Sequence, residues 1–170
     1  LQKMHSIFKL GSVCSRPVRR NRSLIQGDPA APYIFDTTLD PVIEEFVSTC
    51  LDFGWGYWLD SAHITLLVWA DNFWLLANNP EELGKRFRLW SHLLNAKGWT
   101  VPAEGTTWCS TTEDDNFTRP QDTFFDLEKK VITRSSRTVG FKALGAMITF
   151  DGYDASELRA RIARAWAVFK

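Results

Sequence analysis

The first 27 residues of this sequence contain no aspartate or glutamate, although the whole chain of 170 residues is balanced at 20 basic and 20 acidic residues. Overall neutrality gives no bulk attraction to nucleic acid. The start is nevertheless strongly basic, and its bases are Lys3, Lys9, Arg16, Arg19, Arg20 and Arg22. Such a run can meet phosphates or can be a solvated end of the chain, and the sequence leaves both interpretations open.

Cysteine is scarce. The three cysteines, Cys14, Cys50 and Cys109, are odd in number and far apart, which supports neither a disulfide framework nor a zinc site. We expect reduced, structural thiols. Aromatic residues are plentiful by contrast, with 8 Trp and 12 Phe, and 45% of residues are hydrophobic. The chain therefore has enough apolar surface for a folded core, and its length fits one domain or a part of a larger one.

Long apolar runs are also missing. The longest, 64–77, is interrupted by Asp71 and Asn72, and falls short of the roughly 20 residues of a membrane-spanning helix. No secretory signal follows Leu1. We therefore expect an intracellular fragment or processed product with no membrane partner. The sequence does not predict its compartment or its oligomeric state.

Two helices and a hairpin are predicted by periodicity. Apolar residues spaced three and four apart predict a helix from Pro32, which Pro41 should kink or split. Strands over 62–69 and 73–77 should form a hairpin with an acidic tip. A helix should then begin at the cap Asn79 and end at Gly98. The apolar faces of the two helices are Phe35, Leu39, Ile43, Phe46 and Val47, then Leu83, Phe87, Trp90 and Leu94.

The two ends of the chain are less regular. Residues 1–25 predict no element beyond a strand ending near Leu24. Short strands are expected over 99–101, 106–109 and 146–150, strands 130–134 and 138–141 should pair, and 110–121 should be an exposed loop. A last helix should be capped by Asp154. Its buried stripe should consist of Leu158, Ile162, Ala165 and Phe169.

Three short motifs carry the chemistry: a glycine–proline turn with the helix start (26–35), the hairpin tip Trp69-Ala70-Asp71-Asn72 (within 68–73), and a glycine turn entering a strand (141–148). Each alone fits an ordinary turn. In this order, over residues 24–170, they resemble the reverse transcriptase domain of non-long-terminal-repeat retrotransposons. The matching positions are Gln26, Gly27, Pro29, Pro32 and Phe35, then Trp69, Ala70 and Asp71, then Leu144 and Gly145.

The resemblance implies a role for each motif. Gln26, Gly27, Asp28 and Pro29 would hold the template and the incoming deoxynucleoside triphosphate. Trp69 would lie beside the primer end or would be structural filler. Lys142, Leu144 and Gly145 would form the primer grip, and Arg159, Arg161 and Arg164 either reach phosphates or form a solvated helix face. Asp71 would be the catalytic ligand for Mg²⁺ or Mn²⁺, with Asn72 beside it, because nucleotide addition needs metal ions held by oxygen ligands.

Two departures from the family weaken the expected metal site. Asn72 stands where the family has a second Asp, and a neutral amide supplies no charge to hold a divalent ion. The family's partner Asp lies upstream of the Gln-Gly-x-Pro block, where this chain has no acid. Nothing in the spacing of Asp28, Asp36, Asp40 or Asp60 directs a replacement toward Asp71.

The fold implied is α+β: a polymerase palm, with an antiparallel sheet and helices on one face. We expect a basic remnant of fingers and palm over 1–25, a partial palm over 26–153, and the start of a thumb helix over 154–170. The function implied is RNA-directed DNA polymerisation on an RNA template with a DNA primer, inactive in this chain alone. A non-catalytic nucleic-acid-binding remnant and an inactive pseudogene product remain as alternatives.

Overall fold

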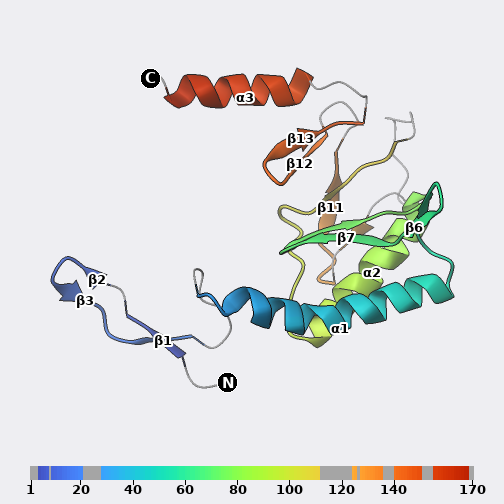
Figure 1. Cartoon of the computed structure of the whole chain (residues 1–170). Helices are drawn as coiled ribbons and strands as arrows, with labels where there is room; N and C mark the ends of the chain where they lie inside the picture. The colour runs from blue at the N-terminus through green and yellow to red at the C-terminus, as the bar shows by residue number, and fades with distance from the viewer. Residues whose placement is uncertain are drawn as a thin grey trace. The chain divides into compact units, whose positions relative to one another are not determined.

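A computed structural model describes residues 4–7, 9–20, 28–111, 124–125, 127–135, 140–150 and 155–168 (Figure 1). The chain divides into two compact units, residues 1–41 and 42–170. Helices and small, mainly antiparallel sheets are both present, which confirms the α+β class. Among the described residues, no helix combines the length and apolar character needed to cross a membrane.

The first unit begins with a two-stranded ribbon. Strand β1 (Met4–Ser6) pairs with β4 (Val18–Arg20), and β2 (Lys9–Leu10) pairs with β3 (Val13–Cys14), both antiparallel. The tip contains Gly11 at φ 60°, in the left-handed region that glycine adopts without steric cost. Sequence periodicity missed these strands because the side chains of β2 and β3 are all exposed, so these strands need no alternation of apolar and polar residues. Leu24 lies outside the described residues.

Helix α1 (Ala31–Asp52) continues through Pro41, so the expectation of a split is wrong. Proline in a helix removes one hydrogen bond, but Pro41 is exposed, where water can satisfy the freed carbonyl. Residues after it are anchored by burial: Val42, Phe46 and Cys50 are each at most 1% exposed. Packing of this stripe therefore outweighs the local cost of proline.

Helix α2 (Pro80–Ala96) has the predicted ends. The Asn79 side chain accepts from the Glu82 N–H at 2.8 Å, and Gly98 follows the helix at φ 79°. Its predicted face is buried or half-buried, and Trp90 lies at the centre of the packing. The Trp90 ring centroid is 5.2 Å from that of Phe46 on α1 and 4.9 Å from that of Phe73 on β8 (Asn72–Leu75).

The expected strand at 99–101 does not form. The Trp99 N–H donates to the Leu94 carbonyl at 3.0 Å, so it helps to end α2 and is not available to a neighbouring strand. Val101 instead packs in an irregular segment against a second core cluster, formed by Phe87, Trp108 and Ile132. The apolar side chain of Val101 is explained by its packing against this cluster and not by a place in a strand.

Among the described residues, the pairing expected between 130–134 and 138–141 is not found. Strand β11 (Val131–Arg134) pairs antiparallel with β10 (Phe124–Phe125) and parallel with β9 (Thr107–Trp108). Phe141 belongs to β12 (Phe141–Ala143), which pairs with β13 (Ala146–Ile148). Residues 138–139 and 112–121, most of the expected loop, lie outside the described part of the chain.

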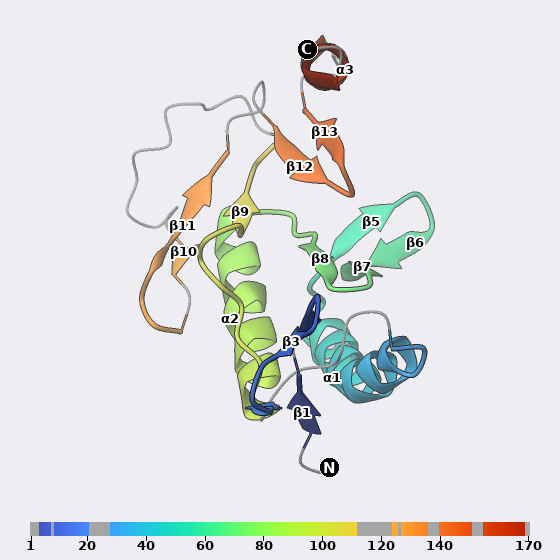
Figure 2. The same ribbon diagram turned by 90° about the vertical axis from the view of Figure 1, so that its left-hand side faces the viewer.

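The described strands form separate hairpins and one three-stranded sheet, and they do not form one continuous antiparallel sheet. Besides the ribbon tip and β12–β13, strand β5 (Tyr57–Leu59) pairs with β6 (Ala62–Ile64), and β7 (Leu66–Trp69) pairs with β8. Figure 2 shows β5–β6 and β12–β13 as separate hairpins. In the described residues, the sheets hold two or three strands each.

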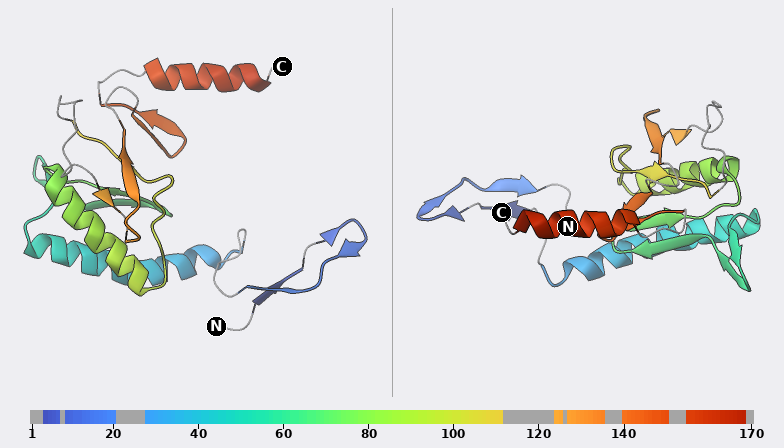
Figure 3. Two further views of the ribbon diagram at one scale, coloured as in Figure 1. Left: turned by 180° about the vertical axis from the view of Figure 1, so that it is seen from behind. Right: turned by 90° about the horizontal axis from the view of Figure 1, so that it is seen from above.

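Helix α3 (Ala155–Val168) does not bury its apolar stripe. Leu158 is 59% exposed, Ile162 48% and Trp166 66%. Ala165 is exposed as well, whereas Asp154 and Phe169 lie outside the described residues. Periodicity correctly predicted the helix, but the charged side contacts β13 and the apolar side is uncovered. The helix lies beside the β12–β13 hairpin both in Figure 1 and in the view from behind (Figure 3, left).

The cysteines are all free, as expected. Cys14 is exposed, Cys50 is buried and Cys109 is half-buried. Burial raises the pKa of the Cys50 thiol, and it raises the pKa of Cys109 to about 11. Thiolate is the reactive form, so these two side chains are unreactive packing groups at neutral pH.

Candidate functional site

The hairpin tip with Asp71 is a tight turn between β7 and β8. Trp69 lies opposite Asn72, so only Ala70 and Asp71 connect the strands. The expected hairpin is confirmed, although the strand predicted over 62–69 is interrupted at Thr65, between β6 and β7. Asp71 is exposed at the outer end of the turn.

The backbone and the amide of Asn72 shape this turn. Ala70 has φ 52°, an uncommon conformation for a residue with a Cβ atom. The Asn72 side-chain nitrogen donates to the Asp71 carboxylate at 3.3 Å and to the Trp69 carbonyl at 3.4 Å. Asn72 therefore closes the turn and neutralises none of the charge on Asp71.

The tip does not form a complete Mg²⁺ site by itself. Magnesium prefers several oxygen ligands in an octahedral arrangement. Asp71 is the one carboxylate of the turn, and Asn72 directs its nitrogen toward it. In the part of the chain that the structure describes, no three His, Cys, Asp or Glu side chains gather as a metal site would require. A catalytic metal would need a further carboxylate.

The template-loop residues lie in the first unit, and the hairpin tip lies in the second. Gln26 and Gly27 are outside the described residues. The Asp28 carboxylate accepts from the Ala30 N–H at 2.9 Å, and its carbonyl accepts from the Ala31 N–H at 3.0 Å. Asp28, followed by Pro29, thus satisfies backbone donors at the start of α1, as acidic residues commonly do before a helix.

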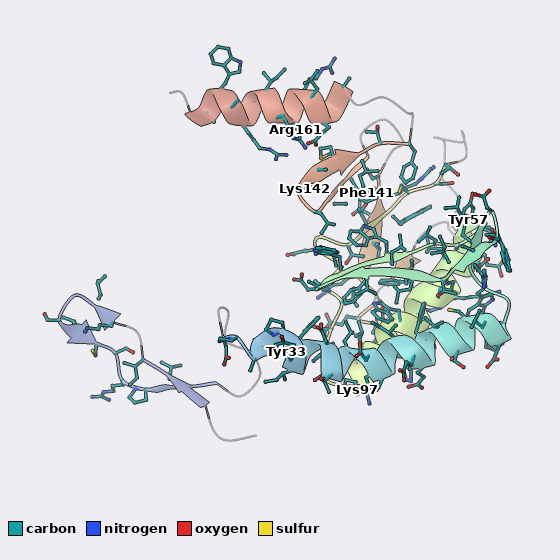
Figure 4. All side chains as sticks on the ribbon, viewed as in Figure 1. Tyr33, Tyr57, Lys97, Phe141, Lys142 and Arg161 are labelled. Carbon is teal, nitrogen blue, oxygen red and sulfur yellow. The ribbon has the colours of Figure 1, made fainter. Side chains whose placement is uncertain are left out.

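The residues expected to form the primer grip lie at and beside a second tight turn. Leu144 and Gly145 join β12 to β13 with φ 48° and 85°, which is typical of a two-residue hairpin connection. Lys142 on β12 is exposed. Figure 4 shows Arg161 extending from α3 on the side of this hairpin.

Helix α3 is fastened to this hairpin by polar contacts. The Met147 N–H donates to the Glu157 carboxylate at 2.5 Å, and both terminal nitrogens of Arg164 lie 3.3 Å from the Gly145 carbonyl. Arg161 donates to the other oxygen of Glu157 at 2.6 Å. The charged face of α3 therefore contacts the β12–β13 hairpin, a role that periodicity alone does not indicate.

Protonation of Glu157 is expected to weaken this attachment. The Met147 N–H, then Arg161, lower the pKa of Glu157, so its contribution is present near neutral pH and is lost as the pH falls through the lowered value. Glu157→Gln should reduce hydrogen-exchange protection of the Met147 amide at neutral pH. Protection equal to that of the natural chain would contradict this prediction. Glu128→Gln, whose partner is the exposed Lys130, is the control and should leave Met147 unchanged.

A buried polar cluster lies where the β5–β6 and β7–β8 hairpins begin, and the sequence did not predict it. The side chain of Arg86 on α2 is 0% exposed and lies 3.5 Å from Glu82, which is 12% exposed. Arg86 donates to the Thr65 carbonyl, directly before β7. Glu82 accepts from the Gly56 N–H, directly before β5, at 2.9 Å. One pair of side chains on α2 thus holds the starts of two hairpins.

This cluster also explains why Glu82 departs from its expected role. A glutamate three residues after the cap commonly returns to the cap backbone. Here the carboxylate contacts Gly56 and Arg86 instead, and the Asn78 side chain donates to the Gly56 carbonyl at 2.7 Å. The guanidinium carbon of Arg86 lies 5.7 Å from the Phe46 ring centroid. Glu82 and Arg86 have the four-residue spacing of a helix pair, but no local signal indicates their burial.

Comparisons of the sequence with family models and with curated proteins, and of the fold with solved structures, found no match. The geometry of the turns and their residues is therefore the basis for the functional argument.

Proposed function

We propose that this chain carries part of the palm of a reverse transcriptase, which adds deoxynucleotides to a DNA primer on an RNA template. The observation that carries the proposal is the position of Asp71 at the tip of a two-residue hairpin turn, next to Trp69. The strand leaving this turn packs through Phe73 on Trp90 of α2. An aspartate at a rigidly supported tip suits a metal-ligand role, because it projects beyond the strands.

The order of the other elements supports the proposal. A second hairpin, with Leu144 and Gly145 at its turn, follows α2 and the β9–β11 sheet. Lys142 on that hairpin offers an exposed cation to a phosphate backbone. Asp71, Lys142 and the Leu144–Gly145 turn belong to the same unit. The proposed role of this unit is to hold the primer end and to supply one carboxylate.

This carboxylate is insufficient for nucleotide addition by the chain alone. Two Mg²⁺ ions stabilise the attacking and leaving oxygens in polymerases, and they need more than one acidic ligand. Asn72 occupies the adjoining position and donates to Asp71. We therefore propose that the chain binds a primer–template without extending it.

Primer extension on an RNA template, with Mg²⁺ or Mn²⁺, tests the catalytic part of the proposal. We expect no extension by the 170-residue chain. Template-dependent extension that is lost in Asp71→Ala would contradict the proposed inactivity, while it would support the polymerase assignment.

Binding is measured separately, with a hybrid that carries a recessed primer end. Lys142→Ala should weaken this binding and reduce its salt dependence by about one phosphate contact. An unchanged affinity and salt slope would count against the palm assignment.

Restoring the second acid provides a test of the tip itself. Asn72→Asp places two carboxylates at the turn, and the added negative charge should raise Mn²⁺ affinity about tenfold. Electron paramagnetic resonance of Mn²⁺ measures the free ion directly. Ser61→Asp, at the turn of the β5–β6 hairpin, adds the same charge elsewhere and serves as the control. Equal gains from both variants would show general electrostatic attraction and would count against a metal-ligand role for this tip.

Nucleic-acid binding that needs no metal ion and no polymerase palm is the second candidate, and Asn72 favours it. An amide that donates to Asp71 stabilises the turn without adding negative charge. A protein that binds without catalysis has no need of a second acid at the tip. Binding of a primer–template that is equal in Mg²⁺ and in EDTA, and unaffected by Asn72→Asp, would favour this candidate over a polymerase palm.

A further inference from the structure

The ribbon of residues 4–20 combines exposed aliphatic side chains with a complete lack of acids. Its described aliphatic side chains are strongly exposed: Ile7 is 59% exposed, Leu10 86%, Val13 70% and Val18 49%. A two-stranded ribbon without a packed face is marginally stable alone. The exposed face of such a ribbon is therefore suited to a partner.

The charge of the ribbon indicates an anionic partner. Its four cations are Lys9, Arg16, Arg19 and Arg20, and residues 4–20 contain no aspartate or glutamate. Lys9 and Arg16 are exposed. Arg19 and Arg20 are consecutive positions of β4, opposite His5 and Met4 of β1, and consecutive strand positions belong to opposite faces of a ribbon. The cationic positions of β4 are therefore divided between the two faces.

We propose that this ribbon inserts into a groove of a nucleic-acid duplex, with its aliphatic tip toward the base edges. The major groove of B-form DNA admits a two-stranded ribbon, with a phosphate backbone on either side. Cationic positions on both faces of β4 match two flanking backbones, whereas a flat anionic membrane would be matched by one cationic face.

The tip has the character of a groove contact. Leu10 and Val13 lie directly opposite each other beside the turn at Gly11, so they share one face of the ribbon. Neither is buried by the protein. Aliphatic side chains contact thymine methyl groups in the major groove, and cations position the protein on phosphates. The tip would supply apolar contacts to the bases, and the cations would supply most of the affinity through the phosphates.

A blunt-ended duplex tests this proposal separately from the palm, because it offers no recessed primer end. Affinity is measured by fluorescence anisotropy across a KCl series. Lys9→Ala/Arg16→Ala should weaken binding and reduce the slope of log affinity against log salt by about 2. Arg88→Ala/Lys97→Ala removes the same two residue types from exposed positions on and just after α2. This control should leave the slope unchanged.

A second variant tests the tip. Leu10→Ser/Val13→Ser should lower duplex affinity about tenfold with the salt slope unchanged, because it removes apolar contact and no charge. Both positions are exposed, so thermal unfolding of the chain should not change. An unchanged affinity in this variant would overturn the assignment of the tip to the groove.

Three other results would overturn the proposal. Equal effects of the ribbon and control pairs would show attraction by net charge alone. Equal binding of single strands and duplex would exclude groove recognition. Binding of anionic vesicles that is lost in the ribbon variants, with duplex binding retained, would assign the ribbon to a lipid surface. Because Asp71 and Lys142 are unaltered throughout, failure here leaves the proposed palm function standing.

Discussion

Replacing Arg86 with alanine is expected to lower the free energy of unfolding by about 3–5 kcal/mol, because it leaves a nearly buried carboxylate without its cation. Arg86 is fully buried and Glu82 is 12% exposed. The substitution also removes the donor to the Thr65 carbonyl and the cation over the Phe46 ring. Denaturant unfolding measures the change in free energy.

A pair on the same helix provides a matched control. Lys85 and Glu81 have the same four-residue spacing and are 2.8 Å apart, but their side chains are 47% and 80% exposed. Lys85→Ala should therefore cost no more than about 0.5 kcal/mol, since exposed pairs contribute little. If both variants lower the free energy of unfolding equally, burial of the Arg86–Glu82 pair is not what stabilises the starts of the two hairpins. Arg86→Met should recover part of the loss by filling the space.

Replacing Trp90 with alanine is the second large effect, at about 3–5 kcal/mol, through the cavity it leaves in the core. Trp90 is 2% exposed and contacts Phe46 on α1 and Phe73 on β8. Because Phe73 lies on the strand that leaves the Asp71 turn, the substitution should also loosen that hairpin. Urea unfolding gives the stability change, and hydrogen exchange of the Phe73 amide reports the hairpin.

Trp166→Ala is the control for this prediction. Its side chain is 66% exposed on α3, so the same substitution should change stability by no more than about 0.5 kcal/mol. A large loss from Trp166→Ala would mean that α3 buries its apolar stripe after all. A small loss from Trp90→Ala would place the core of residues 42–170 elsewhere.

The candidate site illustrates the limit of local sequence patterns. The hairpin with Asp71 at its tip and the turn at Leu144 and Gly145 could be predicted, because two-residue turns depend on neighbouring residues. The contacts that hold the starts of the hairpins to α2 could not be predicted. Arg86 contacts Thr65 and Glu82 contacts Gly56, across 21 and 26 residues of sequence. Such pairs have no periodicity that a single sequence reveals.

Helix α2 with its cap at Asn79 and the acidic hairpin tip were determined by the sequence alone, because caps, turns and apolar periodicity act within a few residues. Tertiary structure decided the rest. Packing keeps α1 continuous through Pro41 and places Val101 in an irregular core segment. It also pairs β11 with β9 and β10. It also turned the charged face of α3 toward the β12–β13 hairpin. These outcomes depend on which distant surfaces and backbone groups become partners, and local periodicity carries no information about that choice.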